Sequence, residues 1–387
     1  MAEKNVGLFP ELAPMKEQEF TTGVLPSQAI RALIATDKIR SRVPIPEEQI
    51  QPASIDLRLG TVGYRVRASF LPGRRRSVEE KVPDLLIGEI DLEKPGLFDK
   101  GCVFIVPLLE ELALPADISA QANPKSTTGR LDIFTRLITD YGVEFERVPK
   151  GYRGKLYAEI VSRTFPIQAC AGMKLNQLRF ARGNPPSHDS ELIDLDERET
   201  LVFEDVDNPA SAVIDKGLRI SLDLQGNGDS EIVAYKARRN APVIDLAKTD
   251  FYNSREYWDP VYKPITKNII LDPGDFYLLA SKEKIRIPPT YAAEMVPFDP
   301  SMGEFRVHYA GFFDPGFGYG SSNIAGTRAV LEVRAHEVPI LLEDAQMVGR
   351  LMYNRMTARP DKIYGTKIGS SYQQQGLAFS RQFKRTW

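Results

Sequence analysis

Short hydrophobic runs, separated by glycine and proline, make up most of the chain. Residues 101–107 read Gly-Cys-Val-Phe-Ile-Val-Pro, and residues 275–279 read Asp-Phe-Tyr-Leu-Leu. Runs of this length between turn-forming residues predict β-strands. One stretch differs, because Ile30, Leu33 and Ile34 share a face of a helix that we expect over residues 28–39, with Ser27 as its N-cap. The pattern predicts a mainly β barrel or sandwich with a few short helices.

The pattern occurs twice along the chain. Several pairs of motifs are separated by the same 173 positions: Asp99–Gly101 and Asp272–Gly274, Leu114–Pro115 and Ile287–Pro288, Tyr157–Ile160 and Val330–Val333. Ser54–Leu57 also resembles Ser221–Leu224. Repetition at one spacing indicates duplication. We expect two similar β domains over residues 1–190 and 191–387, joined by the polar segment 183–208.

Composition narrows the classes of protein. The 387 residues suffice for two domains, and a net charge of −2 provides no general attraction for nucleic acid. No uncharged apolar run reaches the roughly 20 residues of a membrane helix. Residues 1–9 do not resemble a signal peptide, and the two cysteines form no CxxC pair. We therefore expect a soluble cytoplasmic protein that binds neither membrane nor nucleic acid.

Three segments carry candidate chemistry. Residues 51–60 read Gln-Pro-Ala-Ser-Ile-Asp-Leu-Arg-Leu-Gly, an alternating strand in which we expect Asp56 to fix a turn. Residues 125–131 combine hydroxyls with two cations, which suits a phosphate group: Lys125, Ser126, Thr127 and Arg130. A solvated turn is the alternative interpretation. Residues 311–317 place Asp314 in an Asp-Pro-Gly turn among aromatic residues, although a plain turn would have the same sequence.

Two glutamates lie in apolar β runs, at positions that should point inward. They are Glu159 and Glu332. A carboxyl group in such a place has a raised pKa unless it is paired, and so suits general acid–base catalysis. The alternative is a structural glutamate that is bonded to the backbone or to an arginine such as Arg130.

Together these motifs resemble those of the dCTP deaminases, in the deaminase/dUTPase superfamily. Residues 51–60 resemble the family's QPASxDLRLG strand, and residues 125–132 its RSSxxRLG phosphate motif, with Lys125 and Asp132 as departures. The hairpin resembles GxIDPGY. Residues 372–375 resemble the closing KYxxQ tail, with Ser371 in place of lysine. The resemblance implies two dUTPase-like distorted β-barrels, jelly-roll-like in form, and hydrolysis of dCTP to dUTP and ammonia.

The resemblance also implies roles for individual residues. Phosphates would bind Lys125, Ser126, Thr127 and Arg130, and Phe312 and Asp314 would hold the deoxyribose. Tyr372 and Gln375 would lie over the nucleotide. The catalytic glutamate would be Glu332 or Glu159, with Ser126 and Arg130 in the catalytic group. The HxE…PCxxC signature of zinc deaminases is missing from the sequence. We therefore expect no zinc, and Mg²⁺ only as a counter-ion of the triphosphate.

The two halves have lost complementary motifs. Half one retains the phosphate motif but reads Val148–Gly151 where the hairpin should carry aspartate. Half two retains the hairpin but reads Phe298–Glu304, with two acids, where phosphate should bind. We expect one composite site in which Lys125, Ser126 and Arg130 meet Asp314 and Glu332. Since relatives form sites between subunits of a trimer, the resemblance implies a homo-oligomer with a trimer-like assembly of domains.

Two other functions fit the same motifs. One is a dUTP pyrophosphatase, or a bifunctional enzyme that converts dCTP to dUMP. The other is a nucleotide-binding regulatory protein without catalysis, in which the lost motifs reflect decay. The resemblance also leaves dUTP as a possible ligand, and dTTP as a possible feedback ligand.

Overall fold

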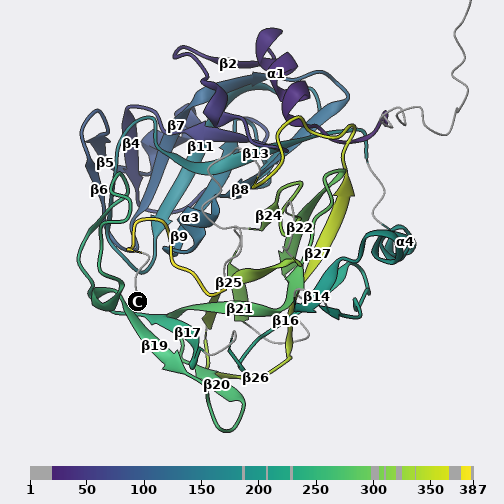
Figure 1. The fold of residues 1–387 in the computed structure, drawn as a ribbon. Coiled ribbons are helices and arrows are strands. Elements are labelled where there is room, and N and C mark those ends of the chain that lie inside the picture. The colour runs from purple at the N-terminus through teal and green to yellow at the C-terminus, as the bar shows by residue number, and fades with distance from the viewer. Residues whose placement is uncertain are drawn as a thin grey trace, which may run out of the picture.

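A computed structural model describes residues 20–184, 188–205, 208–226, 230–297, 305–308, 311–319, 325–335, 337–365 and 376–384. It is mainly β, as the hydrophobic pattern predicts, and the helices are short. Figure 1 shows the first half of the chain, in purple and blue, above the second half in green and yellow. No helix in the described ranges is long and apolar enough to cross a membrane.

The first half contains two larger sheets, and it shares a small sheet with the second half. One sheet has the order β1-β13-β8-β10, with β3 beside β13: Gly23–Val24, Lys174–Arg182, Ile118–Pro124, Arg147–Val148 and Ile55–Arg58. The other has the order β5-β4-β7-β11-β9, with β2 beside β7: Leu86–Asp91, Val62–Val66, Val103–Ala113, Arg153–Ser162, Ile133–Thr139 and Ile39–Ser41. The small sheet combines β6 (Gly96–Phe98), β12 (Ile167–Ala169) and β18 (Ile244–Asp245).

The second half repeats this arrangement. Its largest sheet has the order β15-β14-β21-β17-β19, with β25 beside β21 and β23 beside β25: Asn208–Pro209, Val202–Asp205, Phe276–Ile285, Ile232–Ala237, Trp258–Tyr262, Thr327–Ala335 and Phe305–His308. A second sheet has the order β16-β27-β22-β24: Leu218–Ser221, Met347–Arg355, Tyr291–Pro297 and Phe312–Phe313. β20 (Asn268–Leu271) pairs with β26 (Ile340–Glu343).

The strand registers correct one element of the predicted repeat. Leu59 donates its backbone N–H to the carbonyl of Met173. Leu222 donates in the same way to Gln346, which lies 173 positions after Met173. Leu222 is therefore the counterpart of Leu59, not of Ile55, and the match between the two Ser-x-Asp-Leu sequences is out of register.

The N-terminal helix also differs from its predicted limits. α1 spans Ser27–Ala35, and its N-cap is Pro26, so Ser27 is the first helical residue and not the cap. Its hydroxyl donates instead to the carboxylate of Asp361. The helix ends early because Asp37 takes a left-handed conformation with φ 54°, and Ile39 then begins β2.

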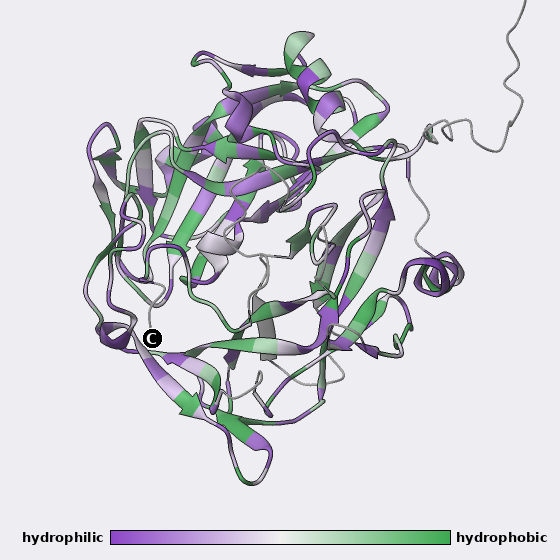
Figure 2. Cartoon of the chain, in the orientation of Figure 1, coloured by the Kyte–Doolittle hydropathy of each residue, from purple (hydrophilic) through white to green (hydrophobic). Residues whose placement is uncertain are grey.

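The other helices are brief. The described residues include the α-helices α2 (Val78–Lys81), α3 (Ser126–Gly129) and α4 (Asp189–Glu199). They also include the 3-10 turns η2 (Glu47–Gln49), η3 (Val82–Asp84) and η4 (Ser254–Glu256). α4 lies inside the segment that we expected to be a plain linker. Its outer face is hydrophilic (Figure 2), whereas Leu192 and Leu195 join the core of the second half.

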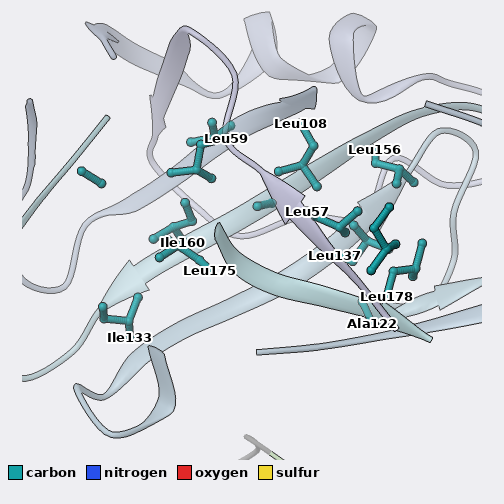
Figure 3. Packing of buried hydrophobic residues seen from close by; sticks show 14 of the residues in the cluster. Leu57, Leu59, Leu108, Ala122, Ile133, Leu137, Leu156, Ile160, Leu175 and Leu178 are labelled. Atoms are coloured by element: carbon teal, nitrogen blue, oxygen red, sulfur yellow. The ribbon is translucent and has the colours of Figure 1, made fainter. Parts of the chain in front are cut away.

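The two largest hydrophobic cores of the described residues lie between the sheets. Figure 3 shows the first, in which leucines of β3, β7, β11 and β13 meet side chains from β8 and β9. This core continues into the second half through Tyr235, Trp258, Phe276 and Phe383. A separate core fills the second half. Burial of aromatic surface therefore stabilises the contact between the halves, and this contact positions the site described next.

Candidate active site

A cavity of about 560 Å³ lies between the two halves. The first half contributes β3, β13 and the α3 turn to its lining. The second half contributes β24, β25 and the C-terminal segment 376–384. Figure 1 shows α3 and β24 facing each other across this junction. The polar, charged and aromatic side chains that line the cavity include Asp56, Lys125, Ser126, Thr127, Arg130, Phe312, Asp314, Arg328, Glu332 and Gln382.

The predicted phosphate motif forms a tight turn at the edge of the cavity. β8 ends at Pro124, and the N–H groups of Thr128 and Gly129 then donate to the carbonyl of Lys125 at 2.8 and 3.0 Å. The hydroxyl of Thr128 donates to the carbonyl of Leu175 at 2.9 Å. The turn is thereby held by the backbone, and Ser126 and Thr127 line the cavity.

A carboxylate neutralises the first cation of this motif. The ammonium of Lys125 forms an ion pair with Asp56, which lies in β3 and is buried. The expectation that Asp56 fixes a turn is therefore wrong, because its side chain points into the cavity and pairs with Lys125. The pair keeps a partly buried ammonium compensated when no anion is bound.

Arg130 connects the same loop to the C-terminal segment. Its guanidinium donates to the carbonyls of Ala378 at 3.1 Å and Phe379 at 3.3 Å. Ser380 donates its hydroxyl to the carbonyl of Thr127 at 2.8 Å. The C-terminal segment therefore packs directly on the loop. The two predicted tail residues, Tyr372 and Gln375, lie outside the described residues, as does the predicted acidic segment 298–304.

Glu332 reaches the loop from the other half of the chain. It lies in β25 opposite Leu278 of β21, and only 3% of its surface is exposed. Its carboxylate sits against Gly129 so closely that a Cβ atom at that position would overlap both carboxylate oxygens. A buried carboxylate from half two thus lies beside the phosphate loop of half one.

Phe312 and Asp314 enter the cavity from β24 and the turn after it. Both are held by Arg179 of β13, whose guanidinium lies 3.9 Å from the centre of the Phe312 ring. The same group donates to Asp314 Oδ1 at 3.4 Å. Burial raises the pKa of Asp314, while the charges of Arg179 and Lys125 oppose that rise. Asp314 is a partly buried acceptor that faces two cations.

Glu159 lies apart from these groups and does not line the cavity. It is fully buried, and it accepts from Arg136 at 2.6 Å. Arg136 in turn stacks on Phe145 at 3.5 Å and donates to Ser69 at 2.9 Å. The structure therefore brings together the predicted residues of the composite site that it describes, but not Glu159, which has its own cationic partner.

The hairpin of the first half lacks the corresponding acid. Val148 pairs with Ala120, and Phe313 pairs with Ala293, which lies 173 positions further on. The residue after Val148 is proline, whereas Asp314 follows Phe313.

Sequence reasoning missed several charged residues around the cavity. Arg334 forms an ion pair with Asp132 and donates to Thr164 at 2.8 Å, linking β25 to the end of the phosphate loop. Asp132 has φ 54°, which explains why the family motif has glycine there. That departure from glycine was the one visible signal. Arg328 forms an ion pair with buried Asp223 at the cavity wall. Asp223 lies in the repeated motif Ser221–Leu224, but no chemistry was expected of it, and no motif marked Arg328.

The described residues contain no group of three or more histidine, cysteine, aspartate or glutamate side chains arranged to hold a metal ion.

Comparisons with known proteins agree with this geometry. The N-terminal domain model of 2'-deoxycytidine 5'-triphosphate deaminase matches residues 21–184, and the C-terminal domain model of the same family matches residues 188–383. A crystal structure of 2'-deoxycytidine 5'-triphosphate deaminase from Agrobacterium tumefaciens superposes with a TM-score of 0.83 at 50% identity, over 87% of this chain and all of the other.

Two curated relatives are more distant. The dCTP deaminase, dUMP-forming, of Halobacterium salinarum is 32% identical over 36% of this chain and 67% of its own length. The dCTP deaminase of Haloarcula marismortui is 29% identical over 41% of this chain and 79% of its own length. The chain therefore belongs to the dCTP deaminase family, and the predicted family and fold class are confirmed.

Proposed function

We propose that the chain hydrolyses dCTP to dUTP and ammonia in the cavity between its halves. The observation that carries the proposal is the position of Glu332, a buried carboxylate of one half, against the phosphate loop of the other. Membership of the dCTP deaminase family supports the same substrate.

The triphosphate is proposed to bind at the α3 turn. Lys125 supplies charge, and the hydroxyls of Ser126 and Thr127 supply hydrogen bonds. A bound phosphate would compete with Asp56 for the ammonium of Lys125, so the ion pair between Lys125 and Asp56 must lengthen when the nucleotide binds. Arg130 adds a second positive charge at the cavity wall while its guanidinium donates to the C-terminal segment. Mg²⁺ is proposed to accompany the triphosphate as its counter-ion.

The nucleoside is proposed to extend from the loop toward β24. The ring of Phe312 offers a face for stacking, and Asp314 accepts the 3'-hydroxyl. Described residues of the C-terminal segment close one wall, since Gln382 lines the cavity, and Tyr372 and Gln375 are proposed to extend this cover over the nucleotide. A nucleoside placed in this way directs its cytosine toward Glu332.

Glu332 is proposed to be the general base and then the general acid. It takes a proton from water as the water oxygen attacks C4, and it passes the proton to N3. The tetrahedral centre then collapses: the C4 hydroxyl loses its proton by way of Glu332 as the C4=O bond forms, the C4–N bond breaks, and the amino group takes up that proton and leaves as ammonia. Donors from Ser126 and Arg130 stabilise charge as it develops. Glu159 is proposed to serve structure, because Arg136 occupies its carboxylate.

A second candidate product is dUMP, because several of the similar enzymes are dUMP-forming dCTP deaminases. That reaction requires a second water in line with the α-phosphate. We further propose a cytoplasmic homo-oligomer, with dTTP as a feedback ligand at the same cavity. A regulatory protein without catalysis is less favoured, since the base and the loop lie together.

The test uses the purified full-length chain with dCTP and Mg²⁺. Ammonia release measures deamination, and anion-exchange chromatography separates dUTP from dUMP. Formation of dUMP and diphosphate would establish the bifunctional reaction instead. Tight binding of dCTP without any release of ammonia would contradict the proposal and support the regulatory alternative.

A further inference from the structure

One buried arginine of the first half holds the hairpin of the second half. Arg179 lies in β13, and 5% of its surface is exposed. Its Nη1 donates to the carbonyl of Ala293 in β22 at 2.9 Å. Its Nη2 donates to the carbonyl of Phe313 at 3.3 Å and to Asp314 Oδ1 at 3.4 Å. A single side chain therefore ties together two strands and an acid of the opposite half.

The aromatic contact completes this arrangement. The Arg179 guanidinium lies 3.9 Å from the centre of the Phe312 ring, which fits a cation–π interaction. Phe312 and Asp314 both line the cavity, whereas Arg179 does not. Arg179 thus acts behind the two residues that are proposed to hold the sugar, and its planar set of donors fixes their relative orientation.

Burial of this charge has an electrostatic consequence. Burial lowers the pKa of Arg179, and the nearby carboxylates of Asp314 and Glu294 oppose that change. The guanidinium in turn opposes the burial-induced rise in the pKa of Asp314. An uncharged side chain at position 179 would leave the partly buried carboxylate of Asp314 beside Asp56, with Lys125 as a nearby cation.

We propose that Arg179 is a positioning residue that holds Phe312 and Asp314 against the phosphate loop and thereby gives the site its selectivity for a nucleotide with a 3'-hydroxyl. This inference rests on the proposed function. It follows that Arg179 acts on substrate discrimination more than on the chemical step, because Glu332 lies on a different strand, β25.

The experiment compares dCTP with 2',3'-dideoxycytidine triphosphate, which lacks the hydroxyl. Arg179→Met retains much of the aliphatic volume but removes every donor, and Arg179→Lys retains the charge without the planar fork. The control is Arg182→Met in the same strand, because Arg182 is 45% exposed and pairs with exposed Asp117. For each protein, kcat/KM and Kd are measured with both nucleotides.

We expect Arg179→Met to reduce kcat/KM for dCTP by roughly 10- to 100-fold, the scale of losing a hydrogen bond to a charged group. The value for the dideoxy nucleotide should change far less, so that the preference for dCTP collapses. Arg179→Lys should lie between, and Arg182→Met should match the wild type. A loss of stability alone would lower kcat/KM equally for both nucleotides.

An unchanged preference for dCTP in folded Arg179→Met or Arg179→Lys would overturn the inference. An equal fall in kcat/KM for both nucleotides would also overturn it. If the wild type binds dCTP but releases no ammonia, the proposed function fails, whereas the ratio of the two Kd values still decides the role of Arg179.

Discussion

Glu159 and Glu332 hold equivalent positions in the two halves, yet their surroundings differ. Glu159 faces Arg136 across the strand pair β9–β11 and is compensated there. Glu332 reaches the cavity wall beside Gly129. The same residue type is therefore paired with an arginine in one half, whereas in the other half it lines the cavity, where we propose that it is catalytic. The difference arises from cross-strand neighbours and not from the local motif.

Replacing Glu332 by glutamine should separate binding from chemistry. The amide preserves size and polarity but cannot take a proton from water. We expect ammonia release from dCTP to fall by about 10² to 10⁴, the usual contribution of a general base. The Kd for dCTP, measured by calorimetry, should remain within a few fold of the wild type.

Glu159→Gln is the matched comparison. This change removes the charge that compensates Arg136, and the cost to stability should be about 1–3 kcal/mol. Turnover should stay near the wild-type value, while the thermal midpoint falls. Near-normal turnover in Glu332→Gln together with an inactive, folded Glu159→Gln would reverse the assignment. Full activity in both would exclude carboxylate catalysis at these two positions.

Some individual residues of the site were accessible to sequence reasoning, and others were not. Lys125, Ser126 and Asp314 were identified because each lies in a short motif with a recognisable chemistry. Arg179 carries no such motif, and its contacts with Asp314 span 135 positions of the chain. Contacts of that kind depend on how two folded halves pack, so a local pattern does not contain them.

At the scale of elements, the α3 turn and β25 fit together through one missing side chain. Gly129 ends α3, and the carboxylate of Glu332 occupies the space that a Cβ atom would need. Helix propensity does not explain this glycine, because alanine is favoured over glycine inside helices by about 1 kcal/mol. The close approach of Glu332 provides a physical reason for the glycine.

Gly129→Ala should therefore impair catalysis without unfolding the chain. The added methyl group must displace Glu332 or the loop, and a misplacement of about 1 Å costs on the order of 10²-fold in rate. Measurements of kcat for dCTP and of the circular dichroism spectrum would separate the two effects. Gly88→Ala is the control, because its Cβ would meet nothing within 4 Å. Equal activity of both variants would contradict this geometry.

Element boundaries show the same limit of local reasoning. The strands with the 173-residue spacing were predictable, since hydrophobic pattern and turn residues coincide there. The Ser-x-Asp-Leu match was misleading, because hydrogen-bond register places Leu222 with Leu59. α4 was missed because its sequence is largely polar, and only Leu192 and Leu195 reach the core.

At the scale of the whole molecule, carboxyl groups near the first-half hairpin should make stability depend on pH. Burial raises the pKa of Glu146 to about 8, and Glu159 and Glu294 add to the rise while the Leu137 N–H and Arg136 oppose it. A pKa that is raised on folding stabilises the folded state at low pH. This contribution is fully present below about 4.5, the ordinary value, and is lost as the pH rises through about 8.

Glu146→Gln should remove that dependence. The variant and the wild type should have similar unfolding midpoints near pH 5, and the variant should be the more stable near pH 9. Glu144→Gln is the control, because Glu144 is exposed in the same loop and pairs with exposed Arg147. Parallel curves for wild type and Glu146→Gln between pH 5 and 9 would contradict the buried ionisation.

The two halves of the chain share an aromatic cluster. We propose that residues 1–190 and 191–387 form two domains that depend on each other. Phe165 of the first half packs against Tyr257 and Trp258 of the second, with ring centres 5.8 and 5.5 Å apart. Phe383 adds to the same cluster. Separation would expose this aromatic surface, and exposed patches of this kind promote association.

Each segment should therefore be inactive when it is produced alone, because Ser126 and Glu332 would lie on different molecules. When the two segments are produced together, they should copurify through a tag on one of them and release ammonia from dCTP. A division elsewhere, for example inside β13, should give no stable complex, since that strand pairs with β8 and β3 of the first half. Wild-type turnover by either segment alone would contradict the composite site, because each would then have to contain its own base and its own phosphate loop.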